Sequence, residues 1–200
     1  MDDAALSAGN FLCRCDSPVI VTVFAGIPDR YAELTEWDAS CGFANGDDGV
    51  MMRRDEDRTA AQHLGGVARW LDFVDSQYRS RTPAAAEIAS RIADTATEVG
   101  ADTIALPLGI QHEDHELTHA ACALLLRDRR ELVRSWVAWV DVPYRLRFPE
   151  QVVDRLESLR QQGFQLAPSE FPMTEAKRAA LAAYPSQAKG LGAAAMENAT

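Results

Sequence analysis

The residues best suited to chemistry are three histidines that lie close together in the second half of the chain. His112, His115 and His119 follow an apolar run at residues 102–108, and Asp114 stands among them. Imidazole is a common metal ligand, and a neighbouring carboxylate can orient its ring. The simpler interpretation is a solvated helix start that Asp114 caps. Because three of the chain's four histidines gather at the end of an expected strand, we favour half of a divalent-metal site.

Other polar side chains stand where a site can use them, and each also has a simpler explanation. Asp2 and Asp3 begin a small-residue helix, where acids are also favoured as caps. Arg53 lies in a charged helix, which is usually a solvated face, although an arginine there can clamp an anion or a hydroxyl. Tyr144 follows an expected strand and either lines a pocket or packs with its hydroxyl in water. His63 stands alone, and we expect it to be structural or solvated.

An alternation of strands and helices is expected to position these residues. Apolar runs predict strands at 18–25, 67–74, 102–108 and 135–142, and helical patterns appear at 2–15, 51–64, 83–99, 114–127 and 149–162. The segment at 27–50, rich in Gly, Asp and Asn, is expected to be a functional loop. This order predicts an α/β fold with a mostly parallel sheet and helices on both faces. Ligands bind at the carboxyl ends of the strands in such sheets.

The length and composition of the chain exclude several classes of protein. The 200 residues fit one domain, which we place at 1–185, and the small, polar segment at 186–200 is expected to be a disordered tail. A net charge of −10 argues against non-specific binding to nucleic acids or anionic membranes. The chain has no apolar run long enough to span a membrane, and its acidic start does not suit a signal peptide. The four cysteines lack metal-binding spacing, so we expect reduced thiols in a cytoplasmic protein.

In their order and spacing, several short motifs resemble those of the PIG-L/LmbE-like de-N-acetylases. The family's first motif is His-Pro-Asp-Asp before a small-residue helix, and residues 1–9 read MDDAALSAG. A strand and a glycine follow as VIVTVFAG, and an Arg-x-x-Glu helix with a Leu-Gly stop corresponds to residues 53–56 and 64–65. Asp75 fits a later aspartate of the family. The last motifs, His-x-Asp-His and Asp-x-Pro-Tyr, correspond to residues 112–115 and 141–144, so the resemblance covers residues 1–165.

The resemblance implies a Rossmann-like sheet and a zinc-dependent hydrolase that removes an N-acetyl or other N-acyl group from an amino sugar or glycoconjugate. Asp3 and His115 correspond to ligands of one zinc ion, and Asp2 corresponds to the general base. His112 would polarise the carbonyl or protonate the leaving amine, and Asp114 would support the site as a second-shell residue. The residues offered for substrate binding are Arg53, Asp75 and Tyr144. The implied partner is a small molecule, and a homo-oligomer is left open.

The sequence departs from the family at its start. The histidine that opens the first motif, a metal ligand in the family, would fall immediately before Met1, and the strand that precedes it is absent. Asp3 and His115 leave a catalytic zinc site one protein ligand short, and His119 supplies the third only if it lies within reach. We therefore expect lower stability and activity than in a full-length relative, with a start set too late as the favoured explanation. The alternative is a catalytically inactive, truncated paralogue that binds a sugar or a partner subunit.

Overall fold

A computed structural model describes residues 1–29, 34–44 and 48–192 of the chain. The chain divides into two compact units, each described here by itself. The first unit contains Met1–Arg81 and Phe171–Thr200, and the second contains Thr82–Glu170. In the described residues, no helix is both long and apolar enough to cross a membrane.

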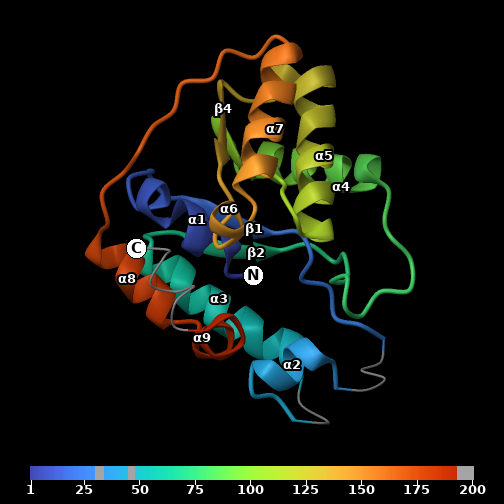
Figure 1. Cartoon of the computed structure of the whole chain (residues 1–200), viewed down its shortest axis with the longest axis vertical. Helices are drawn as coiled ribbons and strands as arrows, with labels where there is room; N and C mark the ends of the chain where they lie inside the picture. The colour runs from blue at the N-terminus through green and yellow to red at the C-terminus, as the bar shows by residue number, and fades with distance from the viewer. Residues whose placement is uncertain (30–33, 45–47, 193–200) are drawn as a thin grey trace. The chain divides into compact units, whose positions relative to one another are not determined.

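The first unit is built around a pair of parallel strands. Its elements are α1 (Asp3–Leu12), β1 (Val19–Thr22), α2 (Glu36–Ser40), α3 (Gly49–His63), β2 (Val67–Trp70), α8 (Glu175–Ala182) and α9 (Pro185–Leu191) (Figure 1). The β1 and β2 strands pair in parallel, from Val19 opposite Val67 to Thr22 opposite Trp70. Helix α3 packs on β2 and on α8, and α8 also packs on α1. Both ends of the described chain therefore contribute to this unit.

The second unit is a strand–helix–strand arrangement with additional helices. Its elements are α4 (Ala85–Glu98), β3 (Thr103–Pro107), α5 (Glu113–Asp128), a short 3₁₀ helix at Arg130–Leu132, β4 (Ser135–Trp139), α6 (Tyr144–Arg147) and α7 (Pro149–Gln161) (Figure 1). The β3 and β4 strands pair in parallel, from Thr103 opposite Ser135 to Pro107 opposite Trp139. Helix α5 connects them, as a parallel pair requires, and packs on β3 and α4. The apolar faces of these elements bury Ile104, Leu106 and Cys122.

The predicted mixed α/β fold with parallel strands is confirmed, and all four predicted strands are present in shortened form. Four α-helices of the described residues were not predicted, namely α2 inside the expected loop, α6 after β4, and α8 and α9 near the C-terminal end. The expected disordered tail is wrong where α9 forms, because Ser186 and Gln187 are buried there. Ser186 donates from its backbone and its hydroxyl to Glu56, and this tertiary contact orders a segment with a small, polar composition. Residues 193–200 lie outside the described part, and the single domain at 1–185 stays a prediction.

Candidate active site

A buried carboxylate lies beside His115 in the second unit. Asp141 follows β4, and none of its surface is exposed. Its Oδ2 atom accepts hydrogen bonds from the backbone N–H groups of Gly109 (2.8 Å) and Ile110 (3.2 Å), and its Oδ1 atom lies 3.2 Å from Nδ1 of His115. An acceptor at this position favours the proton on Nδ1. Nε2 is then the ring nitrogen that suits a metal ion, as in carboxylate–histidine–metal arrangements.

His112 and Tyr144 form an aromatic cluster with His115. The ring centroids of the two histidines are 5.2 Å apart, and the Tyr144 ring lies 5.4 Å from His115 and 6.3 Å from His112. His112 is the N-cap of α5, and its Nδ1 atom accepts from the backbone N–H of Asp114 at 3.2 Å. Because Nδ1 accepts, the neutral ring carries its proton on Nε2. His112 can therefore donate a hydrogen bond without a positive charge.

The carboxylate that supports His115 was assigned incompletely from sequence. The sequence marks Asp141 only as the start of a motif, and the family resemblance implies the supporting role for Asp114. Asp114 is buried in the first turn of α5, and its carbonyl accepts from Thr118. The structure places Asp141, from a later loop, against His115. A role for Asp114 in the site stays a prediction.

His119 is held in the interior by the end of β3. Its Nδ1 atom lies 3.0 Å from the carbonyl of Pro107, and burial lowers the pKa of its imidazole. The same side chain packs against Gly109, where an added Cβ would lie 2.4 Å from Cβ of His119. Gly109 also has a φ of +76°, so it meets two requirements that only glycine satisfies easily. His119 thus helps to shape the loop that leads to His112.

The first unit carries the two acids of the N-terminal motif. Asp2 is buried and precedes α1, whereas the side chain of Asp3 is 37% exposed. The amino group of Met1 lies 3.6 Å from Asp2 and 3.8 Å from Asp3. Burial by itself lowers the pKa of this amine, but Asp3, Asp2 and other nearby acids together raise it to about 10. The paired carboxylates therefore create a negative potential that favours a cation.

Arg53 belongs to a buried cluster on the first unit. Its guanidinium binds Asp38 of α2, and Tyr78 donates to the other oxygen of that carboxylate at 2.7 Å. Arg53 is only 4% exposed and lies over the Phe43 ring. Burial raises the pKa of Tyr78. The cluster ties α2 to α3, and no sequence signal singled out Asp38 or Tyr78 for this role.

Asp75 occupies a turn after β2. Its Oδ1 atom accepts from the backbone N–H of Gln77 at 3.1 Å and lies 3.5 Å from the Ser76 hydroxyl. Substrate binding by Asp75, Arg53 and Tyr144 stays a prediction. Within the second unit, Tyr144 lies beside His112 and His115.

The donor atoms fit zinc in chemical type. Imidazole nitrogen and carboxylate oxygen are both ordinary zinc ligands. No group of three or more potential ligands was found among the described residues. In the second unit, the observation that favours a metal is the Asp141 carboxylate beside His115. In the first unit, Asp2 and Asp3 form a negative corner of their own.

The chain was compared with known protein families. Residues 1–125 match the family model described as PIG-L: GlcNAc-PI de-N-acetylase. The chain belongs to the PIG-L family. The match includes the N-terminal acids and the histidine motif, whereas Asp141 and Tyr144 lie beyond it. No curated protein sequence matches the chain.

Solved structures support the PIG-L assignment at the level of the fold. A deacetylase of the A40926 pseudoaglycone is 25% identical, with a TM-score of 0.69 over 94% of this chain and 78% of its own. A triple mutant of a deacetylase from the teicoplanin biosynthetic pathway is 24% identical, with a TM-score of 0.73 over 98% and 84%. A zinc-inhibited form of a teicoplanin deacetylase is 23% identical, with a TM-score of 0.69 over 93% and 81%.

Proposed function

We propose that this PIG-L family member is a zinc-dependent hydrolase that removes an N-acetyl group from an amino sugar in a glycoconjugate. The observation that carries the proposal is the placement of His115 against the buried Asp141, with His112 and Tyr144 beside it. This arrangement presents a metal-binding nitrogen next to a hydrogen-bond donor. The family match and the deacetylase fold support the same class of reaction.

Asp3 and His115 are the proposed zinc ligands, by correspondence with the family motifs. When bound, zinc polarises the amide carbonyl and lowers the pKa of a coordinated water to roughly 7. Asp2 is the proposed base that takes the second proton of that water. Nε2–H of His112 is the proposed hydrogen-bond donor to the carbonyl oxygen as negative charge develops there. The proton that Asp2 takes from the water is the one that it can pass to the leaving amine. His119 is not part of this scheme, because the family motifs give it no role as a ligand.

The proposed substrate class is a glycoconjugate with an N-acylated amino sugar. One solved structure compared above is a deacetylase of the pseudoaglycone of the antimicrobial reagent A40926. We propose Tyr144, Arg53 and Asp75 as substrate contacts, and Tyr144 lies beside His112 and His115. A cytoplasmic location and a homo-oligomeric state are further proposals from the sequence.

The test is acetate release from N-acetylglucosaminyl compounds, including an N-acetylglucosaminyl glycopeptide, by the whole chain supplied with zinc. We expect His115→Ala and Asp2→Asn to lower the rate by at least about a hundredfold, because each removes a group that acts in the reaction. His63→Ala is the matched control, since His63 is exposed on α3. Parental rates in the Asp2 and His115 variants would contradict the proposed roles. Sugar binding without acetate release would instead favour a non-catalytic binding domain.

A further inference from the structure

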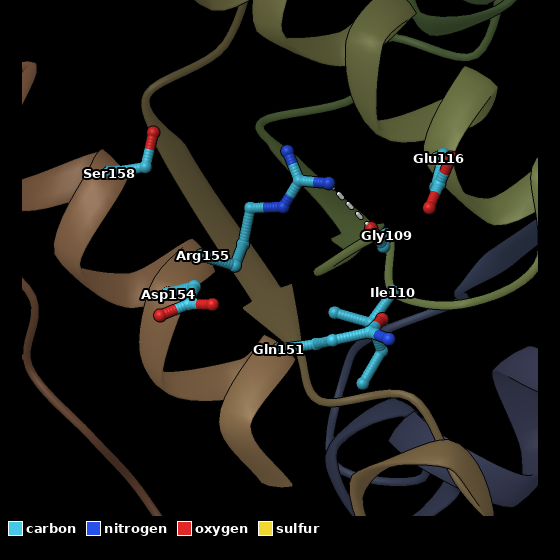
Figure 2. A pocket seen from close by; sticks show the side chains of 7 residues that line it. All are labelled: Gly109, Ile110, Glu116, Gln151, Asp154, Arg155 and Ser158. Carbon is cyan, nitrogen blue, oxygen red and sulfur yellow. Dashed lines mark hydrogen bonds between the residues drawn. The ribbon is translucent and has the colours of Figure 1, made fainter. Parts of the chain in front are cut away.

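One peptide group in the second unit is held from both sides. The carbonyl of Gly109 accepts from Nη2 of Arg155 at 2.7 Å (Figure 2). The N–H of the same peptide group belongs to Ile110 and donates to Oδ2 of Asp141 at 3.2 Å. A charged donor on the carbonyl polarises the amide and strengthens the bond that its N–H makes. Arg155 is therefore connected to Asp141 through a single peptide group.

Arg155 reaches this peptide across a polar cavity on the surface of the second unit. The cavity measures about 260 Å³ and lies between α5 and α7. Figure 2 shows Arg155 extending from α7 toward Gly109, and Gln151 of the same helix also lines the cavity. Gln151 also binds Gln111 of the same loop at 2.9 Å. Helix α7 thus fixes the loop between β3 and α5 from outside, by side chains that lie beyond the family match.

We propose that Arg155 is a positioning residue for His115, acting through the Gly109–Ile110 peptide and Asp141. The carboxylate of Asp141 uses Oδ2 for the loop and Oδ1 for His115, so its orientation depends on the loop. Loss of the Arg155 bond lets the peptide rotate, and the Asp141 carboxylate then holds Nδ1 of His115 less firmly. The part of the inference that concerns zinc rests on the proposed function. The contact between Asp141 and His115 does not depend on zinc.

The experiment compares Arg155→Met, Arg155→Lys and Arg160→Met in the full chain. Arg155→Met keeps most of the apolar stem and removes the donor, whereas Arg155→Lys keeps a charged donor. Arg160 is the matched control, because it lies on the same helix with its side chain 57% exposed and pairs with Glu157. Three quantities are measured: the zinc Kd by competition with a chromophoric chelator, the side-chain ¹⁵N resonances of His115 in zinc-free protein, and the Tm.

We expect Arg155→Met to raise the zinc Kd about tenfold, the low end of the effect of outer groups on metal affinity. It should also shift the Nδ1 resonance of His115, and Arg155→Lys should restore most of both effects. A fall in Tm without a change in that resonance would show a merely structural role and overturn the inference. So would equal resonances and zinc Kd values in Arg155→Met and Arg160→Met. If the parent itself binds no zinc, the proposed function fails, and the His115 resonance alone decides the role of Arg155.

Discussion

At the scale of single residues, the buried Asp141 carboxylate lies where it favours a proton on Nδ1 of His115. Its two oxygens serve different partners, since one accepts from two backbone N–H groups and the other faces His115. A carboxylate can accept on both sides, whereas an amide has one accepting and one donating side. The chemistry of His115 therefore depends on a group that the histidine motif itself does not contain.

The substitution Asp141→Asn tests this dependence with almost no change in shape. The backbone N–H groups require the amide oxygen, so the NH₂ group faces His115 and makes its Nδ1 an acceptor. The proton then moves to Nε2, the atom that we assign to zinc. We expect zinc affinity to fall by about 10–100-fold, as measured by isothermal titration with circular dichroism as the check on folding. Unchanged affinity in a folded variant would contradict the assignment.

His119 supplies a prediction about pH. Burial lowers the pKa of its imidazole in the folded chain, so below about pH 6.5 the unfolded chain takes up a proton that the folded chain does not. Stability is therefore complete above that pH and is lost as the pH falls toward the folded pKa. In urea unfolding, His119→Gln should reduce the loss of unfolding free energy between about pH 7 and pH 5. His63 is exposed, so His63→Gln should leave the loss of unfolding free energy over this pH range unchanged. Equal losses of unfolding free energy in the two variants would refute this account.

At the scale of elements, the loop between β3 and α5 is specified by a glycine. Gly109→Ala adds a Cβ in contact with His119 at a positive φ, so backbone strain and overpacking combine. We expect a loss of about 2–5 kcal/mol in the free energy of unfolding, measured in urea. Gly100→Ala is the control, because Gly100 also has a positive φ (+63°) but nothing lies within 4 Å of its added Cβ. Gly100→Ala should lower the free energy of unfolding by about 1–2 kcal/mol. Similar losses for Gly100→Ala and Gly109→Ala would contradict the contact with His119.

The longer elements were predictable from sequence, and the short helices were not. Apolar runs and helical patterns identified β1 to β4 and the helices α1, α3, α4, α5 and α7. Helix α2 has five residues and α9 has seven, which is too short for periodicity to be informative. Their order comes from distant contacts, such as Asp38 with Arg53 and Ser186 with Glu56. These pairs join residues that are far apart in the sequence, so no local sequence pattern predicts them.

The candidate site was also predictable only in part, because some of its groups come from segments that are distant in sequence. His112 and His115 were recognised because they lie close together in sequence. Their supporting groups come from later segments, since Asp141 follows β4 and Arg155 lies in α7. A carboxylate after a strand is common, and only the folded loop shows which histidine it faces. Sequence therefore identified the reactive side chains, and the structure identified what orients them.

At the scale of the whole molecule, the first unit is closed by the C-terminal helices. Tyr184 is buried, and its hydroxyl donates to Asp57 at 2.8 Å and lies 3.2 Å from the carbonyl of Met1. Asp57 also accepts from Thr22 and Trp70, so one carboxylate joins both strands of this unit to the C-terminal segment. Burial raises the pKa of Asp57, which shows that its charge is costly without these donors. The segment that carries Asp2 and Asp3 thus depends on residues far along the sequence.

The most direct test of the central claim is acetate release by the whole chain as zinc is added back after chelation. The account predicts background release from the zinc-free chain, with a rise that saturates at about one zinc per chain. His63→Ala should follow the same curve, and His115→Ala should stay at background throughout. Acetate release that is unaffected by chelation, or that persists in His115→Ala, would contradict a zinc-dependent N-deacetylase built on this histidine.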